Sequence, residues 1–314
     1  MCNRLAKIQA EESWLTIRMM NNVHWGKGFA GAKRNMGENG SKGQNLSDIQ
    51  RDSDSFWVAG IDLGSLYSKA VVADSRGRII SYSLAKSRIP YEVVARKVLD
   101  DALKSGGLVY ADIRYVIASG YGRSRVPFAN KQVTEISCHA KGANYLYPEV
   151  RTVIDIGGQD SKVIRIGDRG EVLQFVMNDK CAAGTGRFLE VMAGALDITL
   201  EELGKALYLP ESEAEISNMC TVFAESEVIS LIVAGHSKRD IISAIFRAIA
   251  KRIVGMVSQV GVTGEVIITG GGGMNAGLVC ALEEKLRTKI IIPAEPQIVG
   301  ALGAAIIAAE YGKE

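Results

Sequence analysis

The sequence predicts a duplicated α/β protein with two mixed-sheet subdomains. Three observations favour this fold class. Short β-branched runs alternate with helical patterns, and in each half an aspartate and a glycine-containing turn follow the first such run. The two halves also align when the sequence is shifted by 93 residues. Together these features indicate an internal repeat.

The repeat is clearest in the turns. The shift places Asp62 on Asp155 and Gly64 on Gly157 without a gap. It gives six identities in sixteen aligned positions, which in the first half are Asp62, Gly64, Ser68, Lys69, Arg76 and Gly77. Chance does not readily produce such agreement in glycine-bearing and charged turns. Each half is therefore expected to begin with a three-stranded hairpin sheet.

The hydrophobic pattern of the first half begins at Phe56. Alternating and buried β-branched runs predict strands, and a spacing of three and four residues predicts a crossover helix. The expected strands are Trp57–Ile61, Lys69–Ala73, 78–84 and 113–118, and the helix is 93–103.

The second half opens with a buried strand at 153–156 that stops at Gly157-Gly158. Helical periodicity then dominates. The expected helices are 188–196, 200–207, 224–233, 238–260 and 278–286, with a strand at 265–269 and a final apolar helix at 299–309.

Composition sets the expected domain organisation and excludes some partners. Residues 1–55 are rich in polar and small residues, so they are expected to form a disordered extension. The first subdomain is placed at 56–150 and the second at 151–314, with the helix at about 298–311 packing back on the first. A formal charge of +2 and the lack of an apolar run of about 18 residues argue against nucleic acid and membrane partners. We expect a cytoplasmic protein.

The paired turns predict a phosphate site. Backbone amides at Gly64-Ser65 and Gly157-Gly158 lack bulky side chains and are suited to holding phosphate. If the two turns face each other across a cleft, they would clamp a polyphosphate, with Asp62 and Asp155 holding its Mg²⁺ through water. A Walker A loop is absent from the sequence.

A run of glycines, 270–273, lies between a strand and a helix. Gly271-Gly272-Gly273-Met274-Asn275-Ala276 fits the G-x-G-x-x-A pattern of dinucleotide-binding proteins, but too little chain follows it for a domain of that kind. The alternative is a glycine surface against which an adenosine packs.

The five cysteines are odd in number and widely spaced, which argues against a disulfide framework and a zinc ribbon. Cys181 lies in a turn-like context just before Thr185, an expected helix N-cap, where helix amides favour a thiolate or a bound anionic centre. Apolar neighbours predict buried structural thiols at Cys220 and Cys280. For Cys138 a buried thiol and a functional one both remain open, and a ligand role for His139 is not favoured.

Several motifs together carry a family resemblance. They are DLGS, SGYGR, CHA, DIGGQDSK, MNDKCAAGTGRFL, CTVFAESEV and TGG, and they cover most of the chain from Phe56 to Tyr311. The sequence resembles the ATP-dependent activators of 2-hydroxyacyl-CoA dehydratases, a family that includes the ATPase subunits of benzoyl-CoA reductase. The resemblance implies the actin, hexokinase and heat-shock-chaperone ATPase fold around a nucleotide cleft. It also implies a homodimer that shares one four-iron four-sulfur cluster, with Cys138 and Cys181 of each subunit as ligands.

The resemblance assigns further site residues. The phosphate loops would be Asp62 to Ser65 with Lys69, and Asp155 to Asp160, while Gly271 to Gly273 would face the adenosine of ATP or ADP. By analogy with other nucleotide hydrolases, Gln159 or Asp160 would orient the attacking water. Leu66 stands where the family commonly has threonine, which removes one hydroxyl from the first loop.

We therefore expect an ATP-hydrolysing iron–sulfur electron donor. Its implied partners are a dehydratase or CoA-ester reductase component and an upstream donor such as ferredoxin or flavodoxin. The alternative is a small-molecule kinase of the amino-sugar type on the same fold, which would leave Cys138 and Cys181 without a role.

Overall fold

The computed structural model describes residues 33–34, 56–87, 90–209, 211–217 and 220–313. The expected extension, 1–55, lies outside the described residues except for 33–34. The chain divides into two compact units. Unit A contains the described residues of Trp25–Pro148, with Arg169–Glu171 and Ile298–Glu314, and unit B contains Glu149–Asp168 and Val172–Gln297.

Unit A is built on a six-stranded mixed sheet with the order β1-β4-β3-β2-β5-β6. Antiparallel pairing joins β2 to β3 and β3 to β4, and β5 runs parallel to β2. The strands are β1 (Lys33–Arg34), β2 (Trp57–Leu63), β3 (Tyr67–Asp74), β4 (Ile79–Lys86), β5 (Ile113–Ser119) and β6 (Lys131–Gln132).

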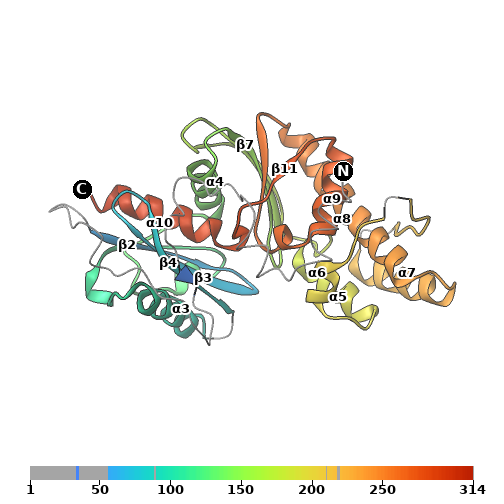
Figure 1. Cartoon of the computed structure of the whole chain (residues 1–314), viewed down its shortest axis with the longest axis horizontal. Helices are drawn as coiled ribbons and strands as arrows, with labels where there is room; N and C mark the ends of the chain where they lie inside the picture. The colour runs from blue at the N-terminus through green and yellow to red at the C-terminus, as the bar shows by residue number, and fades with distance from the viewer. Residues whose placement is uncertain (1–32, 35–55, 88–89, 210, 218–219, 314) are drawn as a thin grey trace. The chain divides into compact units, whose positions relative to one another are not determined.

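Helices cover both faces of this sheet (Figure 1). Alternate residues of a strand point to opposite faces: Ala59 and Ile61 of β2 join the core under α3, whereas a Cβ at Gly60 would overlap the Ala301 carbonyl of α10. The helices are α3 (Tyr91–Gly106), α4 (Glu135–Leu146) and α10 (Val299–Tyr311), with short η2 (Tyr110–Asp112) and η3 (Arg123–Arg125).

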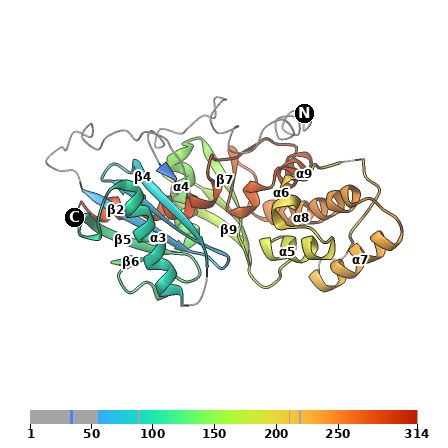
Figure 2. The same cartoon turned by 60° about the horizontal axis from the view of Figure 1, so that its bottom comes forward.

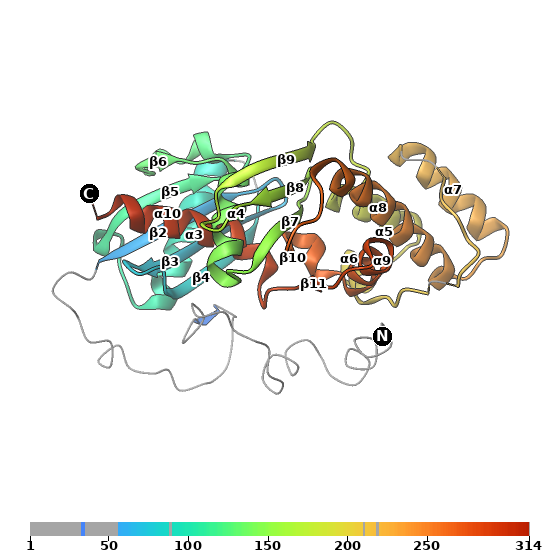
Figure 3. The same ribbon diagram turned by 90° about the horizontal axis from the view of Figure 1, so that it is seen from above.

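Unit B contains a five-stranded mixed sheet with the order β11-β10-β7-β8-β9, whose strands are labelled in Figure 3. Antiparallel pairing joins β7 to β8 and β8 to β9, and β10 runs parallel to β7. The strands are β7 (Val150–Ile156), β8 (Ser161–Ile166), β9 (Val172–Asn178), β10 (Glu265–Thr269) and β11 (Ile290–Ile291).

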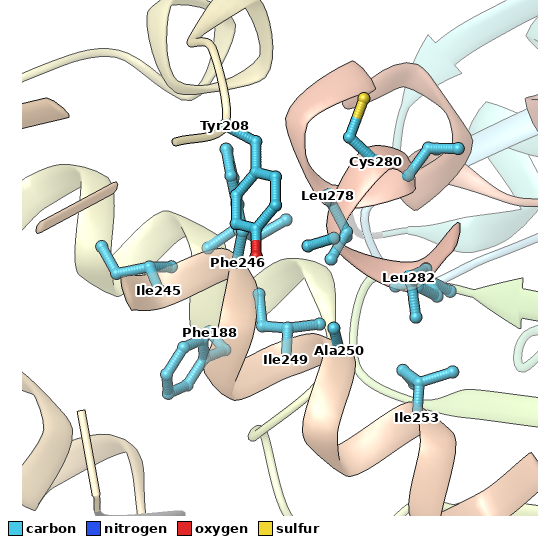
Figure 4. Close-up of a cluster of buried hydrophobic side chains, with 14 of the residues drawn as sticks. Phe188, Tyr208, Ile245, Phe246, Ile249, Ala250, Ile253, Leu278, Cys280 and Leu282 are labelled. Atoms are coloured by element: carbon cyan, nitrogen blue, oxygen red, sulfur yellow. The ribbon is translucent and has the colours of Figure 1, made fainter. Parts of the chain in front are cut away.

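The helices of unit B gather beside its sheet (Figure 2). They are α5 (Gly186–Ala195), α6 (Leu200–Lys205), α7 (Thr221–Val233), α8 (Lys238–Val260) and α9 (Ala276–Leu286), with η4 (Gly271–Met274) and η5 (Pro296–Ile298). Figure 4 shows the core between them, where Phe188 of α5 and Phe246 of α8 lie near Leu278 of α9. This apolar core fixes α5, and with it the loop that contains Cys181.

Most predicted elements are confirmed within one to four residues, and α8 and β10 have the predicted bounds. The duplicated α/β class is also confirmed, since β2-β3-β4 and β7-β8-β9 are equivalent antiparallel sheets, each extended by a parallel strand. The sequence patterns did not predict α4. In the described part of the chain, no helix combines the length and apolar character that crossing a bilayer requires.

Candidate functional site

The first glycine turn lies at the end of β2 in unit A. Asp62 is opposite Lys69 in the β2–β3 register, and Lys69 Nζ lies 2.8 Å from Asp62 Oδ2. Asp62 is buried and Lys69 is partly buried, so the pair is shielded from water. The turn residues Gly64 and Ser65 are partly exposed. The carboxylate is therefore held beneath a turn whose backbone stays accessible.

The same turn is anchored from β4 and crowded from β5. The Ser87 hydroxyl donates to the Gly64 carbonyl at 2.6 Å, and the Gly122 amide donates to the Leu63 carbonyl. Gly120 has φ +84°, and a Cβ there would collide with Asp62 Oδ1. Only glycine satisfies both the backbone conformation and the close approach.

The second glycine turn lies at the end of β7 in unit B. Asp155 is opposite Lys162 in the β7–β8 register, and Lys162 Nζ lies 3.4 Å from Asp155 Oδ2 and 2.8 Å from Asp160 Oδ1. The Thr269 hydroxyl donates to Asp155 Oδ1 at 3.1 Å. Asp155 and Lys162 are almost completely buried, whereas the Asp160 side chain is 25% exposed.

The two turns share more than their sequence. In each, a lysine seven residues after the aspartate pairs with it across the hairpin. Gly270, φ +75°, follows the parallel strand β10 as Gly120 follows β5, and a Cβ there would lie 2.6 Å from Asp155 Oδ1. The sequence repeat is thus a repeat of one structural site, with one copy in each unit.

The second turn is bonded to the first residues of α5. The Gly186 amide donates to the Gly157 carbonyl at 2.9 Å, and the Arg187 amide donates to the Gly158 carbonyl at 2.8 Å. Both donors are orphan groups of a helix N-terminus. The expectation that these amides favour negative charge near Cys181 is therefore wrong for Gly186 and Arg187, because the turn carbonyls occupy them.

The loop that contains Cys181 is held by Asn178, at the end of β9. The Asn178 side-chain amide donates to the carbonyls of Cys181 and Ala183, both at 2.9 Å. Thr185 is the N-cap residue of α5 as predicted, but its hydroxyl donates to the Ala182 carbonyl and makes no capping bond to the helix. Cys181 itself is partly exposed on this fixed loop.

Cys138 has a different environment, on α4 in unit A. Its side chain is completely buried. Burial raises the pKa of the Cys138 thiol to about 12, with a smaller opposing influence from the Ser119 hydroxyl beside it. The Asp62 carboxylate adds to the increase. Cys138 is therefore a neutral thiol next to the carboxylate of the first turn.

The other predicted residues differ in exposure. Gln159 is exposed in the second turn. Of the three glycines expected to face an adenosine, Gly271 is exposed, whereas Gly272 packs on Ile156 and Gly273 on Pro296. Close packing thus accounts for the absence of a side chain at Gly272 and Gly273.

Two further cysteines were predicted to be buried. Cys280 does lie in the unit B core, but it is disulfide-bonded, so the prediction of a thiol there is wrong. Cys220 is exposed, so the prediction for it is wrong. It occupies the N-cap position of α7, where several apolar neighbours such as Val222 and Phe223 are themselves exposed.

A family model identifies the chain. The model of the BadF/BadG/BcrA/BcrD ATPase family matches residues 59–308, which include both glycine turns and both candidate cysteines. The chain belongs to this ATPase family. The expected resemblance to the dehydratase activators is confirmed by relatives of high identity.

Two relatives of high identity are named as dehydratase activators. The 2-hydroxyisocaproyl-CoA dehydratase activator of Clostridioides difficile is 43% identical over 82% of this chain and 97% of its own length. The activator of lactoyl-CoA dehydratase of Anaerotignum propionicum is 46% identical over 82% of this chain and 100% of its own length.

Solved structures agree in fold. The activator of the 2-hydroxyisocaproyl-CoA dehydratase from Clostridium difficile with bound ADPNP superposes with a TM-score of 0.78 at 42% identity, covering 82% of this chain and 96% of that one. A ROK family glucokinase from Streptomyces griseus, at 13% identity and a TM-score of 0.51, shares the fold alone. The chain has the actin- and hexokinase-like ATPase fold.

Sequence reasoning missed three contributors to the site. Lys162 was visible as the aligned counterpart of Lys69, which was assigned to the site while Lys162 was not. Thr269 gave no local signal, because its bond to Asp155 joins two strands that are distant in sequence. Asn178 acts locally, on the carbonyls of Cys181 and Ala183, but its residue type alone does not reveal this role.

Proposed function

We propose that this protein is an ATP-hydrolysing activator of a 2-hydroxyacyl-CoA dehydratase or a related CoA-ester reductase. The observation that carries the proposal is the duplicated site, in which a buried aspartate and lysine underlie an accessible glycine turn in each unit. Relatives of more than 40% identity named as dehydratase activators support the protein partner.

For the Mg²⁺ of the nucleotide, each unit offers one buried aspartate, Asp62 in unit A and Asp155 in unit B, which would hold the ion through water, since hard oxygen ligands suit it. The turn amides at Gly64-Ser65 and Gly157-Gly158 bind phosphate, and Lys69 adds a positive charge beside the first turn. Gln159 or Asp160 orients the water that attacks the terminal phosphate. Gly271 is the exposed glycine available to the adenosine.

The bonds between the second turn and α5 suggest how nucleotide occupancy affects the Cys181 loop. A turn that changes shape around phosphate moves the Gly157 and Gly158 carbonyls, and these carry the first amides of α5 with them. Asn178 ties Cys181 to the end of β9, so the loop is held at both ends. This arrangement supports a conformational signal from ATP to the surface around Cys181.

The finer proposal is a homodimer that shares a four-iron four-sulfur cluster, which would supply one-electron transfer when bound. The two candidate ligands, Cys181 and Cys138, differ in how well their positions suit a cluster shared by two chains. Cys181 is partly exposed on a fixed loop, which suits a ligand shared between two chains. Cys138 is completely buried on α4, so its thiol does not reach a surface that a second chain could share, and it does not fit a cluster between two chains.

The kinase alternative is not favoured. Kinases on this fold resemble the chain at 13% identity, whereas dehydratase activators reach more than 40%. A kinase also needs neither cysteine.

A first experiment tests the nucleotide site. We expect Asp155→Asn to lower kcat for Mg-ATP hydrolysis by about 100-fold or more, because it removes a preorganised charge at the metal position. The matched control is Asp168→Asn, at an 87% exposed carboxylate in the same unit, which should keep wild-type activity. Wild-type turnover by Asp155→Asn would contradict the proposal.

A second experiment tests the iron–sulfur part. Protein purified without oxygen should contain about four iron atoms per dimer, and Cys181→Ser should lose nearly all of them, since the two-fold removes two ligands at once. Four thiolates across a two-fold require two cysteines per chain, and Cys220 is the other free cysteine of the described residues that is not buried, so Cys220→Ser should lose its iron as well. Cys138→Ser is the control and should keep its iron, because Cys138 is completely buried. Iron loss in Cys138→Ser would show instead that Cys138 is a ligand, as the family resemblance implies.

A further inference from the structure

Lys162 is among the largest fully buried side chains of the described chain, and it lies directly beneath the second glycine turn. An ammonium taken out of water costs several kcal/mol unless charged or polar groups replace its hydration. Two carboxylates do so here, at 2.8 Å for Asp160 and 3.4 Å for Asp155. The position of the ammonium is therefore determined by the carboxylates.

The two carboxylates are not equivalent. Asp155 is buried and also accepts the Thr269 hydroxyl, so it is fixed independently of Lys162. Asp160 makes the shorter contact, and its side chain is 25% exposed. Lys162 thus joins a fixed internal carboxylate to one that reaches the open side of the turn.

Asp160 is folded back over the turn. Its carbonyl accepts the Gly157 amide at 2.9 Å, and a Cβ at Gly157 would lie 2.7 Å from Asp160 Oδ1. Lys162 holds that same oxygen. The ammonium therefore fixes the orientation of the Asp160 carboxylate relative to the turn amides.

The repeat shows that this arrangement is specific to the second turn. The shift of 93 residues aligns Lys162 with Lys69 and Asp160 with Tyr67. Lys69 pairs with Asp62, and its side chain is 13% exposed against 2% for Lys162. The two lysines have diverged, with Lys69 near the surface of its turn and Lys162 enclosed under a turn that carries a second carboxylate.

We propose that Lys162 is a positioning residue for ATP hydrolysis that acts through Asp160. It fixes the Asp160 carboxylate at the glycine turn, where that carboxylate orients the attacking water. Its side chain is only 2% exposed, so Lys162 is enclosed by protein and acts through Asp160. This inference rests on the proposed ATPase function and assigns the water-orienting role to Asp160 instead of Gln159.

The experiment is a double-mutant cycle on the full chain with Lys162→Met, Asp160→Asn and the combined variant. Each single change should lower kcat about 10- to 100-fold, the range found when a supporting residue of a site is removed. The KM for Mg-ATP should stay within about threefold of wild type. The combined variant should be no slower than the slower single variant, because both changes remove the same function.

The control is Lys205→Met, which removes an exposed lysine paired with Glu201 and should leave kcat unchanged. Thermal unfolding of each variant separates loss of structure from loss of positioning. If Lys162→Met does not fold, Asp160→Asn decides the matter, since its side chain is partly exposed and its kcat must fall in a folded protein.

Three outcomes would overturn the inference. They are wild-type kcat in folded Lys162→Met, wild-type kcat in Asp160→Asn, and losses that multiply in the combined variant. A wild-type chain that hydrolyses no ATP would instead overturn the proposed function, and this inference with it.

Discussion

Burial decides what the Cys138 thiol can do. A thiolate inside an apolar environment lacks hydration, so burial raises the pKa of the Cys138 thiol to about 12. The neighbouring Asp62 carboxylate acts in the same direction. A thiol of this kind is unreactive at neutral pH, because the thiolate is the nucleophile.

We predict that iron-free folded protein treated with iodoacetamide at pH 8 is alkylated at Cys220 and remains unmodified at Cys138. Mass spectrometry of peptides measures the alkylation of both cysteines in one sample. The reaction of Cys138 should stay slow as the pH rises past 9, since its folded thiolate forms only near pH 12. Denatured protein is the control, in which both thiols should react. Equal labelling of the two in the folded chain would contradict the prediction.

At this scale the sequence predicted the paired aspartates but not the state of each thiol. Asp62 and Asp155 follow from the repeat, because identical turns need identical supporting residues. The burial of Cys138 follows from α4 lying against α10, a contact between residues far apart in the chain. No local pattern around Cys138 indicates it.

The junction between the second turn and α5 is the main functional feature at the scale of elements. Two backbone hydrogen bonds join them, and the approach is close enough that a Cβ at Gly186 would lie 3.2 Å from the Gly157 carbonyl oxygen. The absence of a side chain at Gly186 therefore lets the helix and the turn meet.

We predict that Gly186→Ala raises the KM for Mg-ATP by about threefold to tenfold, because the new methyl group displaces the turn that binds phosphate. Steady-state hydrolysis measures the change. Gly194→Ala is the matched control on the same helix, where nothing lies within 4 Å of the added methyl group. It should leave KM unchanged and add about 0.5–1 kcal/mol of stability. If Gly186→Ala and Gly194→Ala had the same KM for Mg-ATP, the junction between the second turn and α5 would not affect nucleotide binding.

The periodic helices and the strands were predictable because each has one consistent hydrophobic pattern. The exception is α4, whose buried residues include the small residues Cys138, Ala140, Gly142 and Ala143 and whose other residues are all partly buried. Small residues at close helix contacts leave no apolar stripe to recognise. Its partner α10 is apolar almost throughout, which indicated a core helix, and this helix was expected to pack back on the first subdomain.

At the scale of the whole molecule, the chain passes between the two units more than once. Unit A takes its last helix from the C-terminal end of the chain, after unit B has been completed in sequence. In unit A, α10 lies so close to β2 that Gly60 has no space for a Cβ, and so close to α4 that Gly303 has none either. The C-terminal helix is therefore part of the unit A core.

We predict that Gly303→Ala destabilises unit A selectively, by about 1–3 kcal/mol, because its methyl group would overlap the Cys138 carbonyl of α4. Hydrogen exchange with mass spectrometry should show faster exchange in β2, β3 and α4, with α8 and α9 unchanged. Gly204→Ala in α6, where the added methyl group meets nothing within 4 Å, should alter neither unit. An equal increase in the rate of hydrogen exchange in both units would indicate that they unfold together.

The place of α10 also sets the order in which the protein can fold during synthesis. Domains usually fold in the order in which they leave the ribosome, at about 5–20 residues per second. Here the strands of unit A are translated first, yet one face of their sheet stays uncovered until residues 299–311 emerge. Unit B, whose segments all lie before that helix, can reach its native packing earlier. The half that is made first is thus completed last, and during that interval its bare apolar face is the part of the nascent chain that chaperones would have to cover.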